Sequence, residues 1–228
     1  MKLHLNFRVA LTLIAASCSL QAALADPTET KKSLDSLTAG NIRYLSGKST
    51  IPRVDPERRE ITATEGQFPI ATVLGCSDAR VPPEIIFDQK FGKLFVIRVA
   101  GNVTGVSEIA SAEYGVHYLK TPLVVVLGHS SCGAVKAAVE NTPLKGKLPK
   151  LVGLIQPAVD EARKNRSKSD KTDFVDDCIK QNVRYQMKKL LEGSDLISAD
   201  VKANKVKVVG AIRDIKTGKV QWLDDKAD

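Results

Sequence analysis

The chain has 228 residues, of which 43% are hydrophobic, and this suits one globular domain with a full hydrophobic core. Its 34 basic and 26 acidic residues give a net charge of +8, but the two signs are interleaved and only 5% of residues are aromatic. This composition excludes a basic nucleic-acid groove and an aromatic platform for single strands, so we expect no nucleic-acid partner.

The first 25 residues have the pattern of a secretory signal peptide. Lys2 and Arg8 precede an apolar run over residues 9–16, and an Ala-Leu-Ala end closes at Ala25. The apolar run is well short of the roughly 20 residues that cross a membrane. We therefore expect cleavage after Ala25, export to the periplasm and no stable membrane anchor after cleavage. Cleavage would remove two bases and no acid, leaving 32 bases against 26 acids, a net charge of +6.

Residues 26–66 are expected to form an N-terminal helical arm. Within it, residues 30–46 have helical periodicity, and the apolar side of this helix carries Leu34, Leu37 and Leu45. Pro52 and Pro56 interrupt the chain after this helix, and residues 55–66 are typical of a short polar helix.

Residues 67–228 alternate between strand-like and helix-like segments. Three short apolar runs rich in Val and Ile, typical of strands buried on both faces, cover residues 68–75, 93–101 and 121–129. Helical periodicity follows in residues 106–120, 133–140, 148–165 and 173–193; the apolar side of the first of these carries Ile109, Ala112, Val116 and Leu119. Two strands around a Lys-Thr-Gly-Lys turn end the chain. The sequence predicts an α/β domain with a mainly parallel central sheet, an antiparallel edge strand and flanking helices.

The cysteines are a poor disulfide framework. Cys18 would leave with the signal peptide, and the remaining three are Cys76, Cys132 and Cys178. Because an odd number of cysteines suits metal binding better than disulfide pairing, metal is the first candidate. Cys178 lies at helical spacing among apolar residues, which favours core packing.

Three potential metal ligands follow predicted strands. Cys76 comes after the first run, and His129 and Cys132 come at the end of the third. Carboxyl ends of parallel strands share one edge of a sheet, and two thiolates with one imidazole leave the open fourth position of a catalytic zinc site. Singly, each residue could be an ordinary core side chain; their common placement favours the metal site. His117 has no potential metal ligand near it in the sequence. It is expected to be structural, with a role in proton relay as the alternative.

Asp78 and Arg80 alternate with Cys76 at a spacing of two, which puts all three side chains on one face of an extended segment. The motif Cys-x-Asp-x-Arg followed by His-x-x-Cys resembles the β class of carbonic anhydrases, and the similarity extends from about Arg58 to the final strands. The resemblance implies Zn²⁺ on Cys76, His129 and Cys132. It also implies a homodimer or a dimer-based tetramer, with the active site near the interface.

The implied activity is that of a lyase, the reversible hydration of CO2 to bicarbonate and a proton by attack of zinc-bound hydroxide. The residue chemistry agrees with this role, because zinc lowers the pKa of bound water towards about 7. Asp78 can accept the hydrogen bond of the hydroxide and orient it. Arg80 can keep Asp78 ionised, since a nearby cation favours the carboxylate. Asp78 and Arg80 are thus the catalytic candidates, and Asp78 would become a metal ligand only if the site closes.

The resemblance also assigns substrate-binding residues. Four positions match the plant-like layout of the family, namely Gln67, Phe95, Tyr114 and Gly133. A second layout has a regulatory bicarbonate pocket made of Trp, Arg and Tyr. Here the corresponding residues are Val73, Arg98 and Arg213, so we do not expect that pocket.

Two other functions stay open at this point. A related zinc hydrolase acting on another small substrate, such as carbon disulfide, would share the metal ligands and the Asp78–Arg80 pair. A non-catalytic metal or redox protein could instead join Cys76 and Cys132 in a disulfide. A redox protein of this kind would not need Asp78 and Arg80, which argues against it.

Overall fold

The computed structural model describes residues 27–50, 56–167 and 173–223, and these residues contain one five-stranded sheet. The strand order is β2-β1-β3-β4-β5. The first four of these pair in parallel, and β5 pairs antiparallel with β4. The strands are β1 (Ala71–Gly75), β2 (Leu94–Arg98), β3 (Leu123–His129), β4 (Lys207–Arg213) and β5 (Val220–Trp222). The predicted α/β architecture is confirmed, including its antiparallel edge.

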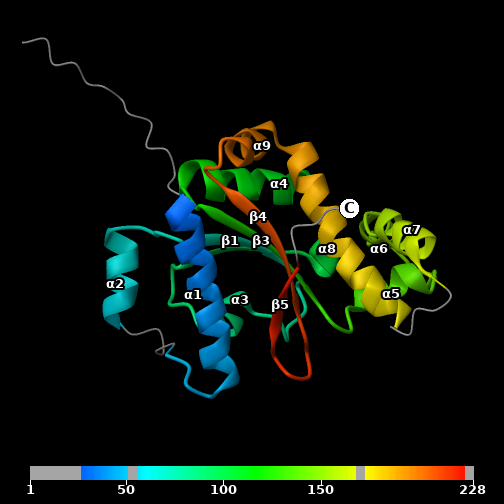
Figure 1. The fold of residues 1–228 in the computed structure, drawn as a ribbon, viewed down its shortest axis with the longest axis horizontal. Helices are drawn as coiled ribbons and strands as arrows, with labels where there is room; N and C mark the ends of the chain where they lie inside the picture. The colour runs from blue at the N-terminus through cyan, green and yellow to red at the C-terminus, as the bar shows by residue number, and fades with distance from the viewer. Residues whose placement is uncertain (1–26, 51–55, 168–172, 224–228) are drawn as a thin grey trace, which may run out of the picture.

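Helices cover both faces of this sheet (Figure 1). They are α1 (Pro27–Leu45), α2 (Pro56–Thr64), α3 (Pro83–Ile86), α4 (Val106–Glu113), α5 (Gly133–Val139), α6 (Leu148–Val152), α7 (Gln156–Asn165), α8 (Phe174–Gly193) and α9 (Asp195–Lys202). Successive residues of a strand point to opposite faces, and the core divides accordingly. Val125 belongs to the same cluster as Leu37 of α1, whereas Val124 packs with Leu190 of α8.

The strands β1 and β3 are continuously buried, as their apolar runs predict. The prediction for β2 is less accurate, because only Leu94 is buried among its five residues. β2 pairs with β1 alone within the described sheet, so it is an edge strand with one side uncovered.

The helix predicted for residues 106–120 divides in two. α4 ends at Glu113, and a single π-helical turn, Tyr114–Tyr118, continues it. Ala112 and Val116 are buried as predicted. The wider turn matters for the site residues because it carries Tyr114 and His117.

α1 packs on the core of its own chain. Leu37 is fully buried, whereas Leu45 is 41% exposed, so only part of the predicted apolar side faces the sheet. Asn41 fixes the helix by donating to the carbonyl oxygens of Ile86 and Gly218 and by accepting from the backbone N–H of Val220. α2, by contrast, has no buried residue.

The predicted signal peptide, residues 1–25, lies outside the described residues. Within the described part of the chain, no helix combines the length and the apolar character needed to cross a membrane.

Candidate metal centre and active site

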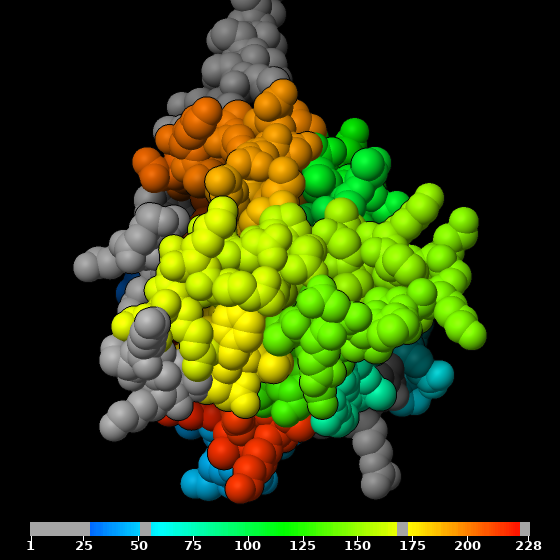
Figure 2. Space-filling model, turned by 90° about the vertical axis from the view of Figure 1, so that its right-hand side faces the viewer, coloured from blue at the N-terminus to red at the C-terminus, as the bar shows by residue number. Residues whose placement is uncertain are grey.

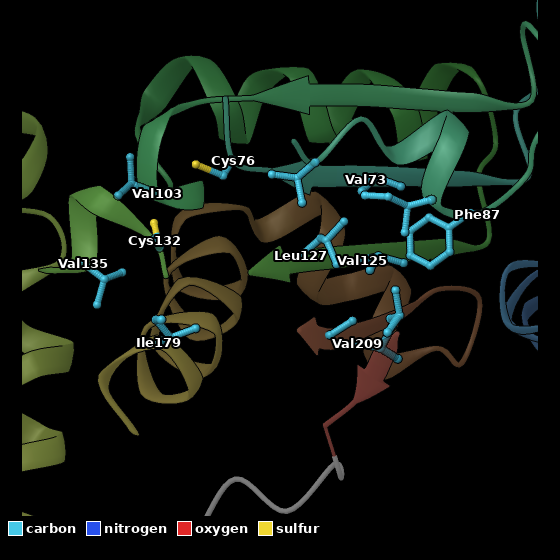
Figure 3. Packing of buried hydrophobic residues seen from close by; sticks show 14 of the residues in the cluster. Val73, Cys76, Phe87, Val103, Val125, Leu127, Cys132, Val135, Ile179 and Val209 are labelled. Carbon is cyan, nitrogen blue, oxygen red and sulfur yellow. The ribbon is translucent and has the colours of Figure 1, made fainter. Parts of the chain in front are cut away.

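The three predicted metal ligands meet at the carboxyl ends of two neighbouring parallel strands. Cys76 directly follows β1, His129 is the last residue of β3, and Cys132 precedes the first residue of α5. Their ligand atoms all lie within 4.8 Å of one another, and all three residues are buried. Figure 3 shows Cys76 and Cys132 side by side at this end of the sheet, next to Val103.

The imidazole of His129 is oriented for metal binding. Its Nδ1 lies 2.9 Å from the carbonyl oxygen of Ser130. Because a carbonyl oxygen only accepts, Nδ1 carries the proton and Nε2 presents its lone pair to the cluster. Nε2 is buried and has no hydrogen-bond partner. A buried nitrogen without a partner is costly unless another group, such as a metal ion, satisfies it.

Ser130 is itself fixed by the β4–β5 hairpin. Its N–H donates to the carbonyl oxygen of Arg213, 2.9 Å away, and its Oγ accepts from the N–H of Ile215 at the same distance. The orientation of His129 therefore depends on the last two strands of the sheet.

The thiols of Cys76 and Cys132 share a hydrogen bond. The hydrogen bond with Cys132 lowers the pKa of Cys76 to about 4, against the effect of burial, and raises the pKa of Cys132 well above its usual range. Backbone N–H groups also donate to the sulfur of Cys76, from Asp78 at 3.4 Å and from Gly101 at 3.3 Å. Such a site stabilises negative charge on sulfur. Two thiolates with one neutral imidazole are a donor set that zinc favours, so the residues present fit that metal.

Asp78 and Arg80 are joined by three hydrogen bonds beside the ligands, one from the backbone N–H of Arg80 and two from its side chain. Arg80 donates from Nε to Oδ1 at 2.9 Å and from Nη2 to Oδ2 at 2.7 Å. These bonds hold the pKa of Asp78 far below its usual range, so the carboxylate is ionised at neutral pH. Oδ2 also lies 3.9 Å from Nε2 of His129, and therefore one carboxylate oxygen faces both the guanidinium and the cluster.

Sequence reasoning missed the role of Arg98 in holding this loop. At the end of β2, it donates from Nε to the carbonyl oxygen of Cys76 at 3.0 Å and from Nη2 to that of Asp78 at 2.6 Å. A basic residue ending the strand next to β1 is the only signal of this role in the sequence. The other two positions of the regulatory pocket differ in environment: Val73 is in the core, and the buried Arg213 donates to the hydroxyl of Tyr44.

The predicted substrate-binding residues separate into two places. Gly133 follows Cys132, and a Cβ added to it would meet no atom within 4 Å, so the space beside it is open. Phe95 instead pairs in register with Thr72, four residues before Cys76, which corresponds to about 13 Å along the strand. The ring of Tyr114 lies 5.8 Å from that of Phe95.

Gln67 also lies at the far end of the sheet, since it precedes β1, and it is exposed. Three of the four matched residues are thus remote from the cluster within one chain. The two other candidates in the sequence are His117 and Cys178. His117 is exposed on the π-helical turn, with its ring against that of Tyr118. Cys178 is fully buried in the core, as its helical spacing predicts.

Comparison with known proteins identifies the family. A model of the family described as "Carbonic anhydrase" matches residues 71–220. A carbonic anhydrase of Mycolicibacterium smegmatis is 36% identical over 194 residues, covering 84% of this chain and 92% of the relative. Carbonic anhydrase 2 of Mycobacterium tuberculosis is 35% identical over 192 residues, with coverages of 82% and 90%.

Solved structures give the same result. The β-carbonic anhydrase CcaA superposes with a TM-score of 0.67 at 27% identity, covering 84% of this chain and 95% of that one. A tetrameric β-carbonic anhydrase of Sordaria macrospora superposes with a TM-score of 0.66 at 25% identity, with coverages of 84% and 97%. The chain therefore belongs to the carbonic anhydrase family, in the β class of these enzymes.

Proposed function

We propose that this enzyme hydrates CO2 reversibly to bicarbonate and a proton, with Zn²⁺ held by Cys76, His129 and Cys132. The observation that carries the proposal is the buried, unpartnered Nε2 of His129, which lies within 4.8 Å of two cysteine sulfurs and 3.9 Å from an ionised carboxylate. Zinc, when bound there, supplies a Lewis acid that lowers the pKa of a coordinated water towards about 7.

The remaining steps belong to Asp78 and Arg80. The strongly lowered pKa keeps Asp78 ionised and makes it a poor proton acceptor, so it would accept a hydrogen bond from a water molecule in the site and orient it without taking its proton. Arg80 fixes the carboxylate through two side-chain bonds and leaves one oxygen facing His129. The open space beside Gly133 gives CO2 a way to reach this position.

One purified sample tests the proposal against its alternatives. We expect about one zinc per subunit and CO2 hydration in a stopped-flow pH-indicator assay. Carbon disulfide hydrolysis with no CO2 hydration would favour the related hydrolase. A zinc-free protein with a Cys76–Cys132 disulfide, identified by mass spectrometry, would favour a redox role.

A dimer is part of the proposal, because one chain separates the matched residues. Phe95, Tyr114 and Tyr118 form a row of contacting rings on the edge-strand side of the sheet. Tyr114 is 47% exposed and Tyr118 is 71% exposed. A second copy packed on this aromatic row would bury it and bring Gln67, Phe95 and Tyr114 of one subunit to the metal site of the other. We propose a homodimer of this kind, or a tetramer built from such dimers; the Sordaria relative is tetrameric.

We also propose export to the periplasm. The basic start, the apolar run and the small residues ending at Ala25 support a cleavable signal peptide.

A further inference from the structure

The connection between β2 and α4 supplies a hydrogen bond to a metal ligand. The backbone N–H of Gly101 donates to the sulfur of Cys76 over 3.3 Å. Gly101 has φ +72° and ψ 16°, a left-handed conformation that favours glycine. A Cβ on this residue would also lie 2.6 Å from Cδ1 of Ile155. The position therefore strongly favours glycine, because any other residue would be strained there and would displace the Ile155 side chain.

A pair of buried amides on α8 holds this connection in place. Asn182 donates from Nδ2 to the carbonyl oxygen of Gly101 at 2.9 Å. Gln186, one turn further along, donates to Oδ1 of Asn182 at 3.0 Å and to the carbonyl oxygen of Leu154 at 3.1 Å. Its Oε1 accepts from the backbone N–H of Thr104 at 2.9 Å and from the hydroxyl of Thr104 at 2.6 Å. The connection is thus held near both ends by two side chains that also bind each other.

The placement of these amides is unusual for a helix that packs on a sheet. Asn182 and Gln186 are each only 1% exposed, and α6, α7 and α8 form a continuous surface on this side of the molecule (Figure 2). Burying two amides costs free energy unless their polar atoms are satisfied, and leucine would fill such positions if packing were all that mattered. Here the side-chain oxygen and nitrogen of both amides have partners.

We propose that Asn182 is a positioning residue for the metal centre: by fixing Gly101, it keeps a hydrogen bond on the Cys76 thiolate and so limits how strongly that sulfur donates electrons to the metal. The inference rests on the proposed zinc site. A sulfur that shares its lone pairs with N–H donors is a weaker ligand, which leaves the metal a stronger Lewis acid. Groups in this outer position typically change metal affinity or activity by about 10- to 100-fold.

The second donor to Cys76 is controlled differently. The N–H of Asp78 belongs to the same loop as the cysteine, and Arg98 fixes that loop through two carbonyl oxygens. The bond from Gly101 therefore depends on α8, and the bond from Asp78 depends on β2. A substitution at Asn182 should remove only the first.

The test uses full-length protein loaded with Co²⁺, whose thiolate ligands give a charge-transfer absorption band. In Asn182→Leu, the Cys76 sulfur should hold its electrons less tightly, so the band should move to longer wavelength. Zinc affinity, measured by competition with a chelator, should rise by about 10-fold, because a sulfur that no longer shares a lone pair with the Gly101 N–H is a stronger ligand. Gln186→Met should move the band in the same direction by a smaller amount. In this variant Asn182 keeps its bond to Gly101 and loses only the hydrogen bond that it accepts from Gln186.

Asn41→Leu is the matched control. Asn41 is also a buried asparagine with three hydrogen bonds, but it joins α1 to the end of α3 and to the β4–β5 hairpin, and none of its bonds reaches Gly101 or Cys76. It should lower the thermal stability of the protein while leaving the band and the zinc affinity unchanged.

The outcomes separate two kinds of failure. If the wild-type protein binds Co²⁺ without a thiolate band, the zinc site itself is wrong. If the wild-type band is present but does not move in Asn182→Leu, or moves equally in Asn41→Leu, the positioning role is wrong and the zinc site stands. Should Asn182→Leu not fold, an unchanged band in Gln186→Met overturns the role.

Discussion

The carboxylate of Asp78 lies between a cation and a proposed metal ligand, with Oδ2 3.9 Å from Nε2 of His129 and 2.7 Å from Nη2 of Arg80. Its charge is therefore held at a fixed point beside the proposed zinc. This relationship gives the first prediction.

Asp78→Asn should retain zinc and lose activity. An amide has a similar shape, but it lacks the negative charge and presents N–H donors where the carboxylate only accepts. We expect the rate of CO2 hydration to fall by at least about 100-fold in stopped-flow measurements. Zinc content should stay at about one per subunit, and an asparagine variant with nearly full activity would contradict the proposed role.

Cys132→Ala should remove most of the bound zinc. Three protein ligands leave little redundancy, and losing one thiolate removes both charge and geometry. The matched control is Cys178→Ala, which deletes the same sulfur from a fully buried site in the core. Elemental analysis should show near-zero zinc in the first variant and about one zinc per subunit in the second. Equal zinc contents would disprove the ligand assignment.

Asp88 should matter for stability and for its dependence on pH. Burial alone would raise the pKa of this carboxyl, but hydrogen bonds from Ser49, Arg43 and Thr50 lower it below the usual range. A carboxyl whose pKa is lowered by folding stabilises the protein above its unfolded pKa of about 3.9, and this stabilisation is lost as the pH falls towards the folded pKa.

Replacing Asp88 by Asn tests this directly. At pH 7 the substitution should lower the free energy of unfolding by about 1.5–3 kcal/mol, because an amide replaces the buried carboxylate that accepts the charged hydrogen bond from Arg43. The difference from wild type should shrink below about pH 4. Urea denaturation of the zinc-loaded proteins at several pH values measures both effects, and a constant difference across the range would refute the assignment.

Tyr118→Glu should weaken the proposed dimer. It places a charge on the aromatic row that the second subunit is proposed to cover, and desolvating that charge opposes association. Light scattering after size exclusion should show a shift towards the monomer mass. Leu154→Glu, on an exposed apolar side chain outside the aromatic row, is the control and should keep the wild-type mass. A monomeric wild-type protein would remove the basis of the prediction.

The mature protein should begin at Asp26. The small residues ending at Ala25 set this position. N-terminal sequencing of protein from the periplasmic fraction checks it. Protein found only in the cytoplasm and still starting at Met1 would show that the segment is not a cleaved signal.

Much of the fold follows from local patterns in the sequence. Continuous Val-rich runs predict β1 and β3, because strands covered on both faces have no polar side. The ligands could then be placed together, since Cys76 and His129 end two such runs. The edge position of β2 could not be predicted in this way, because its central residues 94–97 are as apolar as those of the other runs and strand order depends on long-range packing.

Other parts of the site leave no periodic signal at all. The bond from Asn182 to Gly101 joins residues 81 positions apart, and each is unremarkable in its own segment. The separation of Phe95 and Tyr114 from the cluster is also invisible in the sequence. Family similarity assigns these residues to the substrate pocket, but only the strand register shows that one chain keeps them about 13 Å away.

The three bonds of Asn41 have a consequence for the order of events during synthesis. The helix that contains it is the first one in the described chain, yet two of its bonds wait for residues made 177 and 179 positions later. Contacts between such distant positions form slowly, because a long loop must close first. Two of the three bonds of Asn41 therefore form only after the final hairpin has been made, so the docking of α1 is completed late in synthesis.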